Sequence, residues 1–125
     1  MIYLDTHVVV WLYAGLTEKF SALARTLINE EDVYISPVVR LELQYLFEID
    51  RVTVGPDAIV NDLGSRIGLQ VCSRPFNRVV TQAIGQSWTR DPFDRLIVAQ
   101  AALQDNILLS KDETILRNYA YARWT

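Results

Sequence analysis

The sequence predicts an α/β fold in which a parallel sheet is flanked by helices. Short, β-branched apolar runs alternate with longer stretches of helical periodicity along the 125 residues, a pattern typical of parallel sheets. Half of the residues are hydrophobic, which is enough for a packed core. The length suits one compact domain over residues 1–125, and no repeat, linker or low-complexity segment divides it.

The expected strands are short and apolar on both sides. They are predicted at 2–4, 33–35, 69–72, 107–110 and, less regularly, 122–124. Continuous apolar runs of this kind fit strands that are covered on both faces.

Helices are predicted at 7–13, 21–31, 37–49, 56–67, 77–88 and 92–104, with a short helical turn after Asp112. Thr6 is expected to cap the first helix, and Gly15 is expected to stop it. Ser36 and Asp91 each precede a proline, which favours the first helical position. The elements therefore alternate strand and helix, as in other parallel α/β folds.

Composition excludes several classes of protein. No apolar run approaches the roughly 20 residues that a membrane helix needs. The N-terminus lacks a basic segment and Asp5 interrupts its apolar run, so a signal peptide is not expected and a cytoplasmic location is. Cys72 is the only cysteine, which rules out an internal disulfide and favours a buried packing role.

The charge balance is mildly acidic. A net charge of −3 does not indicate nucleic-acid binding. Ten of the twelve basic residues are arginine, the exceptions being Lys19 and Lys111. Arginine suits bidentate contacts to phosphate, although genome composition explains the same bias.

Four acids lie just beyond the expected strands. Asp5 ends the first strand, Glu42 lies in the helix after the second, Asp94 opens the helix that starts at Pro92, and Asp112 follows the fourth strand. Sites in open α/β sheets form beyond the carboxyl ends of the strands, so the four carboxylates are expected to gather there. Crowded carboxylates repel one another, and Mg²⁺ or Mn²⁺ would compensate their charge. One cysteine and one histidine do not support a zinc site.

Each acid also has a structural interpretation. Asp5 could cap the following helix, Glu42 could lie on the surface of an amphipathic helix, and Asp112 could be a turn residue. Asp94 could satisfy the amino end of its helix, next to the cap Asp91. Their shared position at one edge of the sheet carries the functional interpretation.

The polar residues near these acids give weaker support for a catalytic site than the acids do. His7 suits a helix start or packing better than a catalytic base. Thr6 and Ser110 could hold a metal-bound water or only cap a helix. The basic residues that could contact a phosphate are Arg90, Arg95 and Lys111, and Arg95 equally suits a salt bridge to a neighbouring acid.

Four segments carry these residues, at 2–7, 36–43, 90–97 and 108–112. The D-P-F-D-R-L-I block at 91–97, together with the acid that ends the first strand, resembles the PIN-domain toxins of VapC type. The likeness covers essentially the whole chain, in order and spacing.

The resemblance implies a three-layer α/β/α fold with a five-stranded parallel sheet in the order 3-2-1-4-5. It also implies an Mg²⁺- or Mn²⁺-dependent endonuclease that acts on RNA. The family's four catalytic acids fall on Asp5, Glu42, Asp94 and Asp112, and the expected metal ligands are Asp5, Asp94 and Asp112. Ser110 stands where the family often has threonine, which preserves the hydroxyl, and Asp112 is the least secure of the four.

The resemblance further implies a cognate antitoxin protein, and a homodimer is expected as well. An antitoxin helix is expected in an apolar groove near the N-terminal helices. Trp11, Leu12 and the Phe47 region are candidate walls, although a role in the core suits these residues better. An antitoxin arginine would then enter the acidic pocket.

Other functions remain open but have weaker support. An aspartyl-phosphate phosphotransferase would want Asp-x-Asp after the first strand, where the chain has Asp5, Thr6 and His7. A receiver domain would want a phosphoacceptor aspartate after the third strand, where Cys72 and Ser73 stand. A PIN fold that only binds a partner would be favoured by the loss of one of the best acids, and all are present.

Overall fold

The computed structural model describes residues 1–125, and at its centre is one five-stranded sheet. Its strands are β1 (Ile2–Leu4), β2 (Val33–Ile35), β3 (Gln70–Val71), β4 (Ile107–Leu109) and β5 (Ala122–Arg123). All neighbouring strands pair in parallel, in the order β3-β2-β1-β4-β5. The expected α/β/α fold and its strand order are confirmed.

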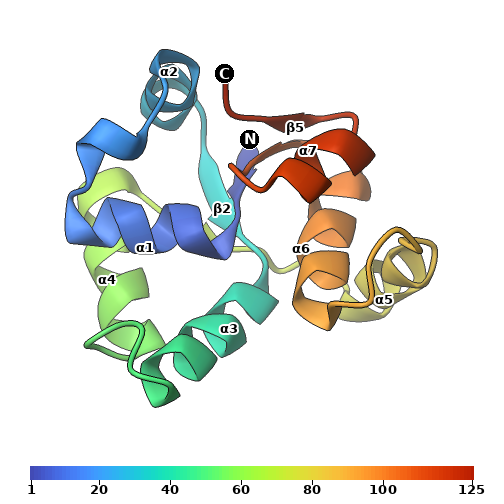
Figure 1. The fold of residues 1–125 in the computed structure, drawn as a ribbon, viewed down its shortest axis with the longest axis horizontal. Coiled ribbons are helices and arrows are strands. Elements are labelled where there is room, and N and C mark those ends of the chain that lie inside the picture. Colours follow the sequence, from blue (N-terminus) through green and yellow to red (C-terminus); the bar gives the residue numbers. More distant parts are fainter.

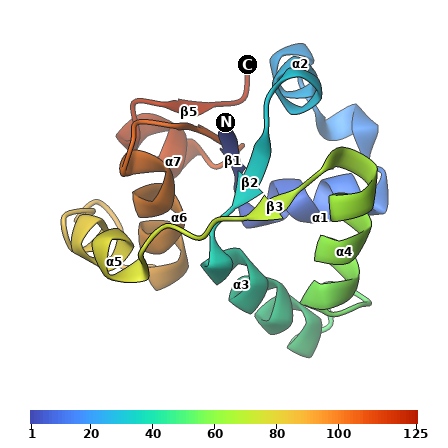
Figure 2. The ribbon, with the colours of Figure 1, turned by 180° about the vertical axis from the view of Figure 1, so that it is seen from behind.

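Seven α-helices flank the sheet. They are α1 (Thr6–Ala14), α2 (Ala22–Glu30), α3 (Pro37–Glu48), α4 (Pro56–Ile67), α5 (Phe76–Ile84), α6 (Pro92–Ala102) and α7 (Glu113–Asn118). Figures 1 and 2 show α1 and α4 toward one side, with α5, α6 and α7 toward the other. Helix α3 lies between these groups and packs against both α4 and α6. None of the helices combines the length and apolar character needed to cross a membrane.

The apolar core includes the central strand β1 and its neighbour β4. Ile2 and Leu4 of β1 and Leu108 and Leu109 of β4 are fully buried and belong to one large apolar cluster. Burial of such a side chain stabilises the fold by about 1.5–3 kcal/mol. The rigid centre of the sheet therefore holds the residues that directly follow β1 and β4.

The start of α1 differs from the expectation. Asp5, not Thr6, is the N-cap: its side chain accepts a hydrogen bond from the Thr6 backbone N–H, and Thr6 is already helical. Gly15 ends the helix with a φ of 71°, a left-handed conformation that glycine adopts without steric cost.

Several element ends also differ. Helix α5 stops at Ile84, not at residue 88, because Gly85 caps it and a turn follows. Helix α6 ends at Ala102, before Asp105 adopts a φ of 52°. A 3-10 turn, η1 (Thr17–Lys19), joins α1 to α2 and was not expected.

Candidate functional site

Asp5 is the buried acid at the carboxyl end of the central strand β1. It is only 7% exposed. One carboxylate oxygen accepts from the Thr6 N–H at 2.8 Å, and the other accepts from the Ser110 hydroxyl at 2.7 Å. Burial raises the pKa of this carboxyl, while both hydrogen bonds act to lower it.

Ser110 and Asp112 follow β4 beside Asp5. The Ser110 Oγ donates to Asp5 and also accepts from the Asp112 backbone N–H at 3.1 Å. The Asp112 carboxylate caps α7 by accepting from Thr114 N–H at 2.8 Å and from Ile115 N–H at 3.0 Å, both with Oδ1. Asp112 is therefore a helix cap with Oδ2 still unused.

Glu42 approaches from α3. The Thr6 hydroxyl donates a hydrogen bond to its Oε1. Burial raises the pKa of the Glu42 carboxyl, the Thr6 hydrogen bond lowers it, and the nearby Asp5 raises it further. Thr6 thus contacts two of the four predicted acids, Asp5 through its backbone and Glu42 through its side chain.

Asp94 lies in the first turn of α6 and its carboxylate makes no hydrogen bond. Its pKa is raised to about 7, first by burial and then by repulsion from Asp91, Asp5, Asp112 and Glu42. The N-cap Asp91 accepts from Phe93 N–H at 2.8 Å and from Asp94 N–H at 3.2 Å. Asp94 is therefore free to bind a cation.

Several of these acids line a pocket of about 430 Å³, called here the acidic pocket. Its lining residues are Asp5, His7, Val8, Trp11, Asp91, Asp94, Lys111 and Asp112. Three of the four predicted acids line it. Glu42 does not, although its charge acts on Asp94.

The donor set of the acidic pocket suits a hard divalent cation. No three His, Cys, Asp or Glu side chains are placed to hold one ion directly. Mg²⁺ characteristically keeps several waters and takes only one or two carboxylates. The Asp94 carboxylate, which makes no hydrogen bond, and the carboxylate oxygens of Asp5 and Asp112 in the same pocket fit such an ion.

The two arginines near the pocket have structural partners. The Arg95 Nε donates to the Thr89 carbonyl at 2.8 Å, and the Arg90 guanidinium donates to the Ser87 carbonyl at 3.0 Å. Arg95 therefore forms no salt bridge to a neighbouring acid, and its contact with a phosphate stays a prediction. Lys111 is the one lysine or arginine that lines the acidic pocket.

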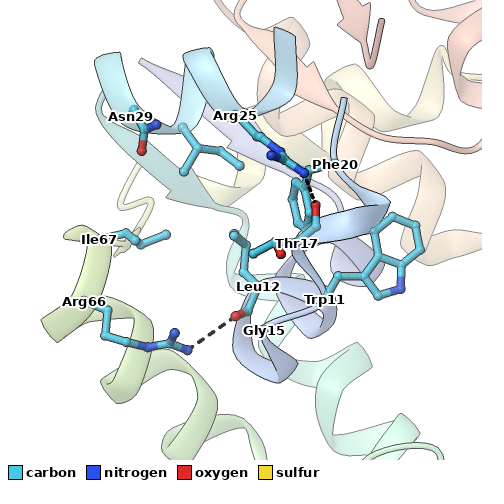
Figure 3. A pocket seen from close by; sticks show the side chains of 10 residues that line it. Trp11, Leu12, Gly15, Thr17, Phe20, Arg25, Asn29, Arg66 and Ile67 are labelled. Atoms are coloured by element: carbon cyan, nitrogen blue, oxygen red, sulfur yellow. Dashed lines mark hydrogen bonds between the residues drawn. The ribbon is translucent and has the colours of Figure 1, made fainter. Parts of the chain in front are cut away.

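A second pocket, of about 310 Å³, lies between α1, α2 and α4 and is called here the apolar pocket. Figure 3 shows side chains from these helices turned toward it, with Arg66 donating to the Leu12 carbonyl. Trp11 and Leu12 line it as expected, but Phe47 does not, because it lies on α3 with 40% of its surface exposed. Trp11 lines both pockets.

Sequence analysis assigned structural roles to Asp91 and His7 near the site, and it did not expect Trp11 to line the acidic pocket. Asp91 was expected only as a cap, yet it also lines the acidic pocket. His7 and Trp11 line it together, and their spacing of four residues on one helix was a usable signal, because such side chains are neighbours.

Comparison with known proteins identifies the family. The PIN domain family model matches residues 2–120. No curated protein matches the chain. The crystal structure of VapBC2 from Rickettsia felis, bound to a DNA fragment from their promoter, contains a similar chain with a TM-score of 0.68 and 18% sequence identity. The match covers 100% of both chains, so the likeness of fold extends from end to end.

Proposed function

Since this chain belongs to the PIN domain family, we propose that it is a Mg²⁺- or Mn²⁺-dependent endoribonuclease and the toxin of a toxin–antitoxin pair. The observation that carries the proposal is the acidic pocket at the carboxyl ends of β1 and β4. Asp5 and Asp94 both have raised pKa values there, and no lysine or arginine forms an ion pair with either acid. A divalent cation would remove this electrostatic cost.

Asp5, Asp94 and Asp112 would hold the cation, directly or through water. Bound there, Mg²⁺ or Mn²⁺ would stabilise charge on a phosphate and lower the pKa of a water that attacks phosphorus. Ser110 orients the Asp5 carboxylate, and the Thr6 hydroxyl orients Glu42. These hydroxyls keep the carboxylate oxygens turned to fixed positions, which preorganises the site.

The test is RNA cleavage with and without Mg²⁺. Wild-type protein should cleave, chelation of the metal should stop cleavage, and Asp5→Ala and Asp94→Ala should each reduce the rate to background. Asp32→Asn is the matched control, because Asp32 is an exposed acid outside the acidic pocket.

If Asp5→Ala or Asp94→Ala cleaved RNA at the wild-type rate, these roles would be wrong. If no preparation cleaved RNA but the chain still bound a partner, a non-catalytic PIN fold would be favoured instead.

A protein partner is the second part of the proposal. The similar structure is of VapBC2 bound to promoter DNA. In this chain, Leu12, Phe20 and Ile28 give the apolar pocket a wall that suits an amphipathic helix. Trp11 joins it to the acidic pocket, so a segment seated in the first pocket can place an arginine in the second.

The partner is tested with the product of the adjacent reading frame. Its affinity should fall as Mg²⁺ is added, because arginine and metal compete for the same oxygens, and Asp94→Asn should weaken it. An affinity indifferent to Mg²⁺, to salt and to Asp94→Asn would mean that inhibition works in another way.

A second copy of the chain is the third part. Leu41 and Tyr45 are 61% and 51% exposed on one side of α3. Arg40 and Glu48 are eight residues apart on the same helix, so antiparallel pairing of two α3 helices would bring each arginine to the partner copy's glutamate. Opposite charges in such positions favour self-association.

Light scattering tests the homodimer. Leu41→Asp should give a monomer, whereas Leu23→Asp, which changes an exposed leucine on α2, should not. Charge reversal at Arg40 alone should weaken the dimer, and Glu48→Arg added to Arg40→Glu should restore it. A wild-type monomer at all concentrations would contradict this part.

A further inference from the structure

The lining of the acidic pocket includes two aromatic rings that the metal chemistry does not use. His7 and Trp11 both line it and are neighbours on α1, with ring centroids 6.3 Å apart and planes at 47°. The His7 residue is exposed. Its imidazole makes no hydrogen bond and no ion pair.

The structural roles considered for His7 are taken by other residues. Asp5, not His7, caps α1. His7 is also not a core residue, because its side chain faces solvent. The His7 ring is therefore an exposed aromatic surface in the same pocket as Asp5 and Asp94.

The Trp11 indole, which lies beside the His7 ring, packs against several other side chains. It packs edge-on against Phe20 at 6.3 Å and 88°, and against Trp124 at 5.8 Å and 70°. The Lys19 ammonium lies 5.3 Å from the indole centroid. Trp11 is therefore packed on several sides, and its indole lies beside the His7 ring in a tilted contact.

A nucleotide bound in the acidic pocket would bring its base to these rings. Its phosphate would lie near the carboxylates and the Lys111 ammonium, which forms no ion pair with the protein. Any unstacked base offers a flat face that can stack on an aromatic side chain.

We infer that the His7 imidazole, beside Trp11, is a stacking site for a nucleobase next to the phosphate in the acidic pocket. The inference rests on the proposed function. It requires that the bound strand have a base free to leave its own stack, so a nucleotide held in a duplex is a poor ligand at this position.

Binding of labelled RNA tests the inference without relying on cleavage. The probes are a short oligoadenylate and an abasic ribose-phosphate strand of the same length, measured by fluorescence anisotropy. Ca²⁺ replaces Mg²⁺, and gel electrophoresis checks that the strands stay intact. Wild-type protein should bind the oligoadenylate more tightly than the abasic strand.

The variants separate stacking from other roles of histidine. His7→Ala should weaken oligoadenylate binding about 5- to 150-fold, the range for loss of one stacked base, and should leave abasic binding unchanged. His7→Phe should retain most of the affinity, because it keeps a flat ring without ring nitrogens. Phe76→Ala is the control, since Phe76 is an exposed aromatic on α5 outside the pocket.

Two results would overturn the inference while leaving the nuclease proposal standing. In one, His7→Ala binds both strands as wild type does, while Mg²⁺-dependent RNA cleavage persists. In the other, His7→Phe loses as much affinity as His7→Ala, which would mean that a ring nitrogen is needed. A protein that neither binds nor cleaves RNA would overturn both proposals together.

Discussion

The carboxylates in and beside the acidic pocket contact hydroxyl and backbone groups or nothing, and none of them pairs with a lysine or arginine. Ser110 and Thr6 donate to Asp5 and Glu42, and the Asp94 carboxylate makes no hydrogen bond at all. Carboxylates that are crowded and partly desolvated without a cationic partner retain protons to higher pH. In the metal-free protein these carboxylates therefore repel one another, and protonation or a bound cation would relieve that repulsion.

Asp94 should make the metal-free protein less stable at neutral than at mildly acidic pH. Its folded-state pKa is about 7, against 3.8 for the exposed group. The folded state thus binds this proton more tightly than the unfolded state does. The contribution of the Asp94 carboxyl to stability is therefore fully present below about pH 4 and is lost as pH rises through about 7. Because solvent screens this half-buried group, we expect a loss on the order of 1–2 kcal/mol for this carboxyl.

Urea unfolding at pH 5 and pH 8, in the presence of a chelator, measures this effect. Asp94→Asn should flatten the pH dependence and stabilise the metal-free protein at pH 8. Asp32→Asn, at an exposed acid outside the pocket, should not. An unchanged slope in Asp94→Asn would assign the pH dependence to other groups.

Ser110 should matter through the orientation of Asp5. Ser110→Ala removes the donor to a buried carboxylate oxygen, which costs about 1–3 kcal/mol of stability and should lower the cleavage rate. Ser110→Thr keeps the hydroxyl and should restore both properties. Thermal unfolding and initial cleavage rates at saturating Mg²⁺ provide the measurements, and a Ser110→Ala enzyme as active as wild type would contradict the role.

At the scale of the element, the helix starts build the pocket. Asp5, Asp91 and Asp112 are the N-caps of α1, α6 and α7, and all three line the acidic pocket. Each of these carboxylates therefore serves two purposes, since it satisfies backbone N–H groups and adds charge to the site. The structural and functional interpretations of these acids are compatible.

Substitution of Asp112 separates the two purposes. Asp112→Ala removes the cap of α7 and should cost about 0.5–2 kcal/mol, as well as activity. Asp112→Asn keeps a good capping side chain, so its stability should stay near wild type while metal-dependent cleavage falls. Chemical denaturation and Mn²⁺ titration of activity distinguish the variants. Equal activity of Asp112→Asn and wild type would show that the carboxylate only caps.

At the scale of the whole molecule, the sheet brings the site together. Parallel pairing of β1 with β4 places Asp5 beside Ser110, which lies 105 residues away in the chain. The α3 and α6 helices then add Glu42 and Asp94. A ligand bound across these elements should stabilise the entire fold, because it binds only when all of them are in place.

Mg²⁺ or Mn²⁺ should therefore raise the unfolding temperature of the wild-type protein. A ligand at one hundred times its Kd adds about 2.7 kcal/mol to the free energy of unfolding. Asp5→Asn and Asp94→Asn should each reduce this rise in unfolding temperature, whereas Asp32→Asn should leave it close to that of the wild type. Scanning calorimetry with and without metal makes the comparison. A response of wild-type size in both pocket variants would place the metal elsewhere.

The sequence by itself determined the alternation of strands and helices, because apolar periodicity and capping signals act over a few residues. It also predicted that four acids, Asp5, Glu42, Asp94 and Asp112, gather at one edge of a parallel sheet, since the carboxyl ends of such strands meet there. The strand order came from the likeness of motifs to a known family, not from local patterns.

Only the tertiary structure decided which side chains touch. Thr6 donates to Glu42, Arg95 binds a backbone carbonyl, and Trp11 forms a wall of two pockets at once. Glu42 proved to lie beside the acidic pocket without lining it. Such contacts depend on side-chain rotamers and on the packing of helices far apart in the chain. Local sequence signals contain no information on these rotamers or on the packing of distant helices, whereas the packed fold selects one arrangement of each.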